Sequence, residues 1–137
     1  MKRLIMLLMT GITAFVGAQK SEKNSIIQKQ QIMDLNKITN ENVKKAIEAL
    51  ENGDKSWYSY FIEHPAMTDD GNKIDFKSFF SKALGEEKFL SIDKVENDGK
   101  DVYGNFKAGK WGTFKVFFKF HQNSEGKFDR LDIGQTN

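Results

Sequence analysis

One stretch near the end of the chain, residues 111–135, constrains the fold more than any other. Its sequence, WGTFKVFFKFHQNSEGKFDRLDIGQ, contains a long alternation, a polar turn and a second, shorter run. Side chains of a β-strand point alternately to opposite faces, so the alternation predicts a strand with two different faces. One face would carry Phe114, Val116, Phe118 and Phe120, and the other Lys115, Phe117, Lys119 and His121. Burying each large apolar side chain contributes ~1.5–3 kcal/mol, so this predicted strand pair can anchor a small domain.

The beginning of the chain has the pattern of an export signal. Lys2 and Arg3 are followed by the largely apolar residues 4–16 and by small residues at Gly17 and Ala18. A transmembrane anchor is the alternative, but the apolar run is shorter than the ~20 residues that span a bilayer, and no stop-transfer charges follow it. We therefore predict that residues 1–18 are a cleaved signal peptide and that the mature protein is periplasmic or secreted.

Charge and cysteine content narrow the range of partners. The 137 residues include 21 basic and 19 acidic side chains, so removal of Lys2 and Arg3 leaves 19 of each. Nucleic-acid binding depends on clustered positive charge, which a balanced surface lacks, so we predict no nucleic-acid partner. The chain has no Cys and therefore no disulfide. We expect one domain that is stabilised by its core.

Two helices are predicted in the first part of that domain. Residues 40–52 carry Val43, Ala46, Ile47 and Leu50 at helical spacing, with Thr39 or Asn40 as the N-cap and Gly53 at the end. Asp54 would cap a second, shorter helix that is rich in aromatic residues and is ended by His64-Pro65. Residues 19–38 fit no single period, so an extra helix, an ordered strap and a loose arm all remain open. We assign 19–38 to an N-terminal arm or linker and 39–137 to the domain.

The remaining pattern is a hairpin, a third helix and four strands. Residues 66–74 predict a hairpin around Asp69-Asp70-Gly71-Asn72, and Asp75 would cap a helix with an apolar stripe that ends at Gly85. Four strands are predicted at residues 89–95, 102–107, 113–121 and 128–133. Helices that precede an antiparallel sheet indicate an α+β fold.

These elements resemble the nuclear transport factor 2-like, or SnoaL-like, superfamily over about residues 39–136. The resemblance rests on the turn at 51–54, the aromatic second helix, the hairpin with Gly71, and residues 125–134 of the last strand pair. It implies a cone-shaped, curved antiparallel sheet wrapped around about three N-terminal helices, often with an apolar interior pocket and a dimer interface on the outer sheet face. The same fold carries isomerases, dehydratases, cyclases and proteins without catalysis, so function must be argued from the site.

The resemblance also implies where catalytic groups would lie. In ketosteroid-isomerase-like members an acidic base follows the first hairpin strand, which corresponds here to Asp69 or Asp70. The tyrosine of such members corresponds to about Ala46, and their second acid to Phe117 or Phe118, so neither oxyanion donor is present. An Asp-Asp-Gly sequence is also an ordinary turn, which makes Asp69 and Asp70 weak catalytic candidates.

Metal and cofactor sites have no support in the sequence. His64 and His121 are the only histidines, and neither has carboxylates at metal-ligand spacing. No glycine-rich phosphate loop or nucleophile elbow is present. We predict neither a metal nor a cofactor.

The alternation of the strands assigns residues to the two sheet faces. The inner set would add Leu90, Ile92, Val102, Gly104, Phe106, Leu131 and Ile133 to the four residues named first. We predict that an interior pocket is lined by Trp57, Phe61, Phe80, Val102, Phe114, Phe118 and Ile133. The outer face would carry most of the charge, which is typical of a solvated sheet face with cross-strand ion pairs. Its aromatic centre is equally typical of a homodimer interface, and the two interpretations stay open for Tyr103, Lys115, Phe117, Lys119 and Arg130.

The favoured functional hypothesis is an exported domain without assigned catalysis that binds a small hydrophobic molecule or a protein partner. It rests on an inner face with few groups that could transfer a proton. The alternative is a small isomerase, dehydratase or cyclase that acts on an apolar substrate with an Asp base.

Overall fold

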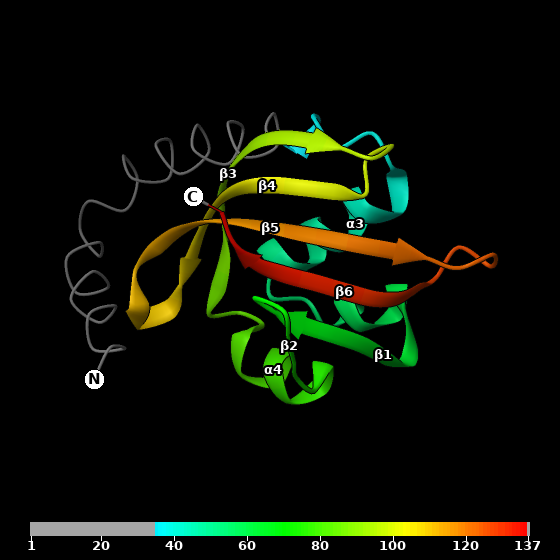
Figure 1. Cartoon of the computed structure of the whole chain (residues 1–137), viewed down its shortest axis with the longest axis horizontal. Coiled ribbons are helices and arrows are strands. Elements are labelled where there is room, and N and C mark those ends of the chain that lie inside the picture. The colour runs from blue at the N-terminus through cyan, green and yellow to red at the C-terminus, as the bar shows by residue number, and fades with distance from the viewer. Residues whose placement is uncertain (1–34, 137) are drawn as a thin grey trace, which may run out of the picture. The chain divides into compact units, whose positions relative to one another are not determined.

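A computed structural model describes residues 35–136, so the predicted signal peptide and residues 19–34 of the predicted arm lie outside the described residues (Figure 1). The helical elements are α3 (Glu41–Glu51), η1 (Lys55–Tyr60), α4 (Phe76–Ala83) and η2 (Gly109–Trp111), of which η1 and η2 are 3-10 helices. The strands are β1 (Phe61–Asp69), β2 (Asn72–Lys73), β3 (Glu87–Glu96), β4 (Asp101–Ala108), β5 (Thr113–Gln122) and β6 (Phe128–Gln135). No helix in this part of the chain has the length and apolar character needed to cross a bilayer.

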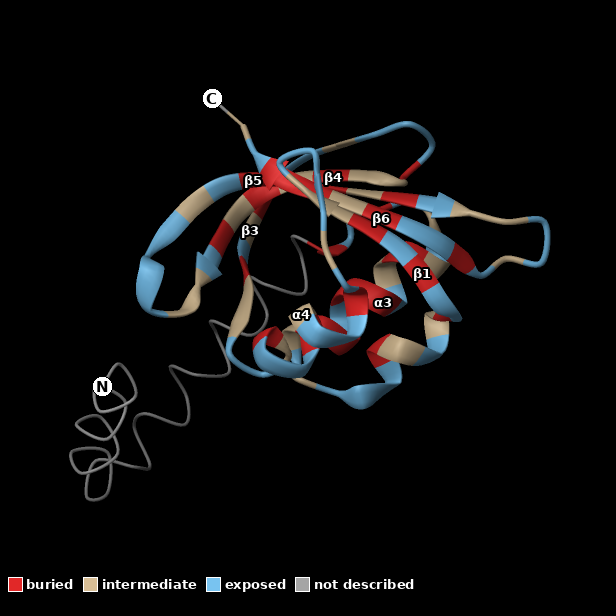
Figure 2. Cartoon of the chain, turned by 60° about the horizontal axis from the view of Figure 1, so that its bottom comes forward, coloured by how far each residue is buried: buried red, intermediate tan, exposed pale blue. Residues whose placement is uncertain are grey.

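The six strands form one curved, open sheet. Their order is β2-β1-β6-β5-β4-β3, and all neighbours are antiparallel except β1 and β6, which are parallel. The sheet arches over α3 and α4, and its buried residues face the helices (Figure 2). The predicted α+β architecture is therefore confirmed, with one parallel strand pair in an otherwise antiparallel sheet.

Helix α3 begins and ends at the predicted residues. The Asn40 side chain accepts a hydrogen bond from the Val43 N–H at 3.0 Å, which satisfies a free donor of the first turn. Gly53 follows the helix with φ +64°, a conformation that glycine adopts without a steric cost. Residues Val43, Ala46, Ile47, Ala49 and Leu50 are buried under the sheet.

The segment after α3 differs from the prediction. Asp54 caps the next helix as expected, but this helix is a short 3-10 helix that ends at Tyr60 and not at His64-Pro65. His64 and Pro65 lie within β1. Proline has no N–H to donate to a neighbouring strand, and the β1–β6 pairing shifts register between Phe61 and Ala66, which accommodates it. The prediction that the helix continues to His64-Pro65 was therefore wrong, because it ends four residues before His64, at Tyr60.

The predicted hairpin and third helix are both present. Thr68 pairs with Lys73 and Asp69 with Asn72, so Asp70 and Gly71 form the turn, with φ +53° and +86°. Asp75 caps α4 by accepting a hydrogen bond from the Ser78 N–H at 2.8 Å.

Strands β3 to β6 form the predicted antiparallel meander. Val102, Phe106, Val116, Phe118, Phe120, Leu131 and Ile133 are buried on its inner face, as predicted. Leu90 is an exception, because β3 shifts register between Phe89 and Ser91 and turns Phe89 inward while Leu90 is 43% exposed. Opposite this irregularity, a Cβ on Gly104 would collide with the backbone oxygen of Ser91. The prediction that Leu90 belongs to the inner set was therefore wrong, since a strict alternation cannot anticipate a bulge.

Aromatic rings fill the space between α4, η1 and the sheet. The Trp57 ring lies 4.9 Å from the Phe61 ring and 4.8 Å from the Phe80 ring, measured between centroids. Phe76 stacks against the same indole at 6.2 Å, and Phe120 approaches it from the sheet. Leu35 and Ile38, which the sequence assigned to the arm, are buried with this core.

Candidate functional site

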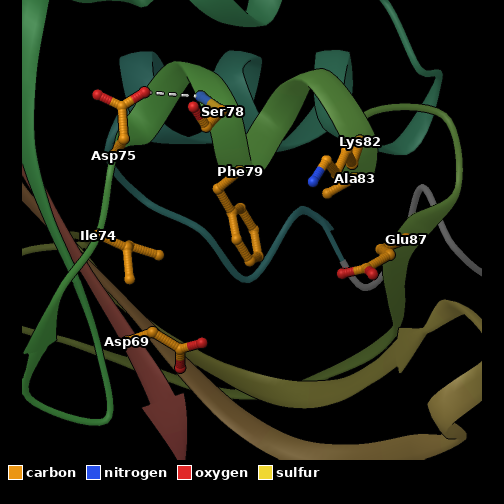
Figure 3. A pocket seen from close by; sticks show the side chains of 8 residues that line it. All are labelled: Asp69, Ile74, Asp75, Ser78, Phe79, Lys82, Ala83 and Glu87. Carbon is orange, nitrogen blue, oxygen red and sulfur yellow. Dashed lines mark hydrogen bonds between the residues drawn. The ribbon is translucent and has the colours of Figure 1, made fainter.

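Two adjoining pockets lie between α4 and the concave face of the sheet. The first, which we call the sheet pocket, has a volume of about 420 Å³. The second, which we call the helix pocket, has a volume of about 370 Å³ and lies against α4. Asp69, Phe79 and Glu87 line both, so the pockets form one continuous hollow. In Figure 3 the Phe79 ring points from α4 into the helix pocket, with the carboxylates of Asp69 and Glu87 on different sides of it.

The sheet pocket has mainly apolar walls. Its lining comprises Phe79, Phe106, Ala108, Trp111, Phe114, Val116, Phe118 and Ile133, together with Asp69, Asp70, Glu87, Gly134 and Gln135. Trp111, the last residue of η2, is 71% exposed; Gly109, the first residue of η2, and Gly112, which follows it, both have positive φ. The helix pocket is more polar, because Asp75, Ser78 and Lys82 line it beside Ile74 and Ala83.

Asp69 is the predicted acid that faces both pockets. It is the last residue of β1, paired with Ile133 of β6 and with Asn72 of β2. Partial burial, and then the negative charge of Asp70, raise the pKa of the Asp69 carboxyl above its usual range. A carboxyl with a raised pKa at the wall of a pocket is able to hold or accept a proton there.

Asp70 has a structural role at the same turn. Its N–H donates to the Ile133 carbonyl at 2.9 Å, and its carboxylate Oδ1 accepts a hydrogen bond from the Gln135 N–H at 2.9 Å. These two bonds extend the pairing of β1 with β6 past the end of β1. Of the two predicted candidates, Asp70 therefore has its carboxylate engaged with the backbone, whereas Asp69 presents its carboxylate to the hollow.

Glu87 is the second acid of the hollow and was not singled out from the sequence. It is the first residue of β3, where the chain returns from α4. Burial, and then the charges of Asp69 and Glu86, raise the pKa of the Glu87 carboxyl. Among residues 35–136, none of the ion pairs within 4.0 Å involves Asp69 or Glu87. Lys82 lines the helix pocket without pairing with either acid at that distance.

The residues predicted to line a pocket fall into two groups. Phe114, Phe118 and Ile133 line the sheet pocket. Trp57, Phe61, Phe80 and Val102 are at most 4% exposed and belong to the packed core, away from the lining of both pockets. The aromatic rings of η1, α4 and the sheet fill the interior at that end, whereas the sheet pocket lies at the end where Trp111 and Phe79 are.

The outer sheet face holds the charged residues that the sequence assigned to it. Tyr103, Lys115, Phe117, Lys119 and Arg130 all lie on this face, and Tyr103 and Phe117 are opposite each other in the β4–β5 pairing. Lys119 Nζ lies 5.1 Å from the centre of the Phe117 ring, and Tyr103 is similarly approached by Lys94 Nζ at 4.7 Å. The face thus combines two half-buried aromatic rings with surrounding charge.

Asp132 lies at the centre of a hydrogen-bonded cluster on this outer face. It accepts hydrogen bonds from Thr68 Oγ1 at 2.6 Å and Arg130 Nε at 3.0 Å, and His121 Nε2 lies 2.8 Å from its Oδ2. Partial burial raises the pKa of Asp132, but the hydrogen bonds with Arg130, Thr68 and His121 together hold it below its usual range. The cluster ties β1, β5 and β6 together and points away from the pockets.

The positions that correspond to oxyanion donors in ketosteroid-isomerase-like proteins carry none here. Ala46 is fully buried in α3, Phe118 lines the sheet pocket, and Phe117 lies on the outer face. Within the described part of the chain, no three His, Asp or Glu side chains gather in a way that could hold a metal ion. His64 is exposed in β1, and its nearest ion-pair partner is Glu63 at 3.9 Å.

Glu87, Phe79 and Trp111 are among the pocket residues that were not predicted from the sequence to line a pocket. Glu87 precedes the predicted strand, Phe79 was assigned to the apolar stripe of a helix, and Trp111 to a strand connection. A polar residue between a helix end and a strand is a weak signal, because only the tertiary fold brings it opposite Asp69.

Comparisons with known proteins agree with this fold. No protein-family model and no curated protein sequence matches the chain significantly. Among solved structures, a SnoaL-like protein of unknown function from Burkholderia thailandensis matches 73% of this chain and 98% of its own, with a TM-score of 0.54 and 13% identity. SalBIII, an epoxide hydrolase/cyclase-like enzyme with a role in pyran ring formation in the polyether salinomycin, is also similar. It matches 72% of this chain and 90% of its own (TM-score 0.51, 15% identity).

A third similar structure contains a bound pigment. The orange carotenoid protein of Anabaena, solved with canthaxanthin, matches 70% of this chain with a TM-score of 0.53 and 20% identity, but the match spans only 36% of that longer protein. At these identities the likenesses concern the fold. The chain thus has the nuclear transport factor 2-like, or SnoaL-like, fold that its sequence resembles.

Proposed function

We propose that the protein is an exported domain that binds a small apolar molecule in the sheet pocket. The observation that carries the proposal is a hollow of about 420 Å³ whose walls are mainly aromatic and aliphatic side chains. Pockets of ~300–1,000 Å³ with apolar walls and a few polar groups are typical of small-molecule sites. The canthaxanthin in the Anabaena protein gives this proposal support by analogy, since it is a hydrophobic ligand of a protein with a similar fold.

Calorimetric titration with cyclohexylmethanol, a small neutral probe, tests the proposal. We expect saturable binding that falls at least tenfold in Phe114→Gln, because a polar amide would replace part of the pocket wall. Phe117→Gln is the matched control, since this residue lies on the same strand but on the outer face, and its affinity should stay within about twofold of wild type. Absence of binding to the wild-type chain, or equal losses in both variants, would refute the assignment of the site.

An acid–base enzyme is the second candidate function, and Asp69 is the observation that favours it. Its carboxyl faces the pocket with a raised pKa, and SalBIII, named as an epoxide hydrolase/cyclase-like enzyme, has a similar fold. A base of this kind could remove a proton from an apolar substrate without help from the absent oxyanion donors, but with a smaller rate acceleration. Any turnover found with this protein should be lost in Asp69→Asn and retained in Asp70→Asn; turnover that survives both changes would exclude this candidate.

Two further parts of the proposal concern location and assembly. We infer that the signal at residues 1–18 is removed on export, so that the exported protein begins at Gln19; N-terminal sequencing tests this.

We also infer that the outer sheet face pairs two copies of the chain. The two aromatic rings ringed by charge support this, since interfaces commonly have an aromatic centre and a polar rim. Sedimentation of wild type as a monomer would overturn the dimer.

A further inference from the structure

Among residues 35–136, the lining of the sheet pocket combines apolar surface with ionisable side chains of one sign only. Asp69, Asp70 and Glu87 are its ionisable residues, and the rest of the lining is apolar, glycine or the neutral Gln135. Asp70 is already engaged with the Gln135 N–H. Two carboxylates, Asp69 and Glu87, are therefore the groups that a molecule in the pocket would meet.

Neither carboxylate has an ion-pair partner within 4.0 Å among residues 35–136; Lys82, which lines the helix pocket with them, is farther away than that. The five ion pairs among residues 35–136 leave both out. Their charges repel, since Asp69 contributes to the raised pKa of Glu87. A positive charge facing both would be favoured twice, by attraction to each acid and by relief of their mutual repulsion.

The aromatic wall is suited to the same kind of ligand. Trp111 exposes most of its ring at the edge of the sheet pocket, and the ammonium of Lys110 already lies 5.1 Å from the centre of that ring. An indole ring attracts cations through its electron-rich faces, so the ring has a second face for another ammonium group. Phe79, Phe114 and Phe118 supply the apolar surface for the rest of such a molecule.

The charge of the pocket also disfavours the opposite class of ligand. A carboxylate or phosphate in the sheet pocket would stand beside Asp69 and Glu87, and the lining residues within 35–136 include no side-chain cation. Of the two pockets, Lys82 lines only the helix pocket. Like charges in a partly desolvated site repel each other, so acidic molecules should bind more weakly.

We propose that the ligand of the sheet pocket is a small apolar amine, bound as its cation with the ammonium facing the acidic part of the lining, Asp69 and Glu87, and the hydrocarbon part against the aromatic wall. The inference rests on the proposed function, because it names the chemical class of the molecule that the same pocket binds. It goes further in assigning the two acids to recognition of charge.

The experiment compares three probes of the same shape in calorimetric titrations at pH 7 and low salt. They are cyclohexylmethylamine, the neutral cyclohexylmethanol and the anionic cyclohexanecarboxylate. We expect the wild-type chain to bind the amine at least tenfold more tightly than the alcohol, and the carboxylate more weakly than the alcohol. In the double variant Asp69→Asn, Glu87→Gln, the amine and the alcohol should differ in affinity by less than about twofold.

A control variant and the possible outcomes separate the two proposals. Asp93→Asn removes a charge of the outer face, where Asp93 pairs with Lys115, and should leave the amine preference unchanged. If the alcohol binds and the amine is no tighter, the amine inference fails and the proposed function stands. If none of the probes binds, both fail. An amine preference that persists in the double variant would also overturn the role of the two acids.

Discussion

Replacing Phe80 by alanine is expected to lower the free energy of unfolding by about 3–5 kcal/mol, the usual cost of removing a buried aromatic ring. Phe80 is fully buried, and its ring centre lies 4.8 Å from Trp57, 5.0 Å from Phe76 and 4.8 Å from Phe79. Trp57 belongs to η1 and Phe76 and Phe79 to α4 itself, and these packed rings cannot all move into the space, so most of the volume would remain as a cavity.

Phe79→Ala is the matched control for this prediction. Phe79 is the preceding residue of α4 but is only partly buried, because its ring lines the pockets. Its replacement should cost clearly less stability while weakening the binding of an apolar probe. Urea unfolding gives the free energies of both variants. Equal losses for the two, or a greater loss for Phe79→Ala, would contradict the division between filled core and open pocket.

The free energy of unfolding is expected to fall as the pH rises from about 4.5 to 7, because of the titration of Glu51. It is the last residue of α3, and its Oε2 accepts a hydrogen bond from the Phe89 N–H at 2.6 Å. Burial raises the pKa of the Glu51 carboxyl from 4.5 to about 7, against the opposing effects of that hydrogen bond and of Lys88. Between these two values the folded protein keeps a proton that the unfolded chain has lost.

The sign of the effect follows from this difference in bound protons. The contribution of protonated Glu51 is fully present below pH 4.5 and is lost as the pH rises through 7. A tenfold change in an equilibrium constant corresponds to ~1.4 kcal/mol, so a pKa raised from 4.5 to about 7 corresponds to a loss on the order of 3 kcal/mol. Glu51→Gln, which stays neutral and can still accept from Phe89, should therefore gain stability relative to wild type as the pH rises.

Urea unfolding of wild type and Glu51→Gln at several pH values between 4 and 8 measures this difference. Taking the difference between the two proteins cancels the titration of the other groups. Glu48→Gln is the control, since Glu48 is exposed on the same helix. A difference between wild type and Glu51→Gln that does not change with pH would contradict the buried, protonated state of Glu51.

Local signals predicted most of the elements correctly. The caps at Asn40, Asp54 and Asp75 act on their nearest neighbours, and the alternation from Phe114 to Phe120 describes a strand whose inner side is half-buried at Phe114 and buried from Val116 onward. The errors arise where a distant strand decides the outcome. Pro65 lies in a strand because β6 pairs with β1 across an irregular register.

The lining of the pockets was harder to predict from the sequence for the same reason. Alternation correctly turned Phe114, Phe118 and Ile133 inward, but it cannot say where an inner face is filled and where it stays open. That depends on how the rings of η1 and α4 reach the sheet. Asp69 and Glu87 are 18 positions apart in sequence and meet at one hollow because α4 returns the chain to the sheet at Glu87.

The central claim is that a small apolar molecule occupies the sheet pocket, and the two tryptophans test it most directly. Trp111 lines this pocket and is exposed, whereas Trp57 is fully buried in the core and lines neither pocket. A titration of the ¹⁵N-labelled protein with cyclohexylmethanol can follow the two indole N–H signals in one NMR spectrum. We predict a saturable shift of the Trp111 signal with little change at Trp57. Saturable binding that leaves the Trp111 signal unmoved, or no binding at all, would contradict the account.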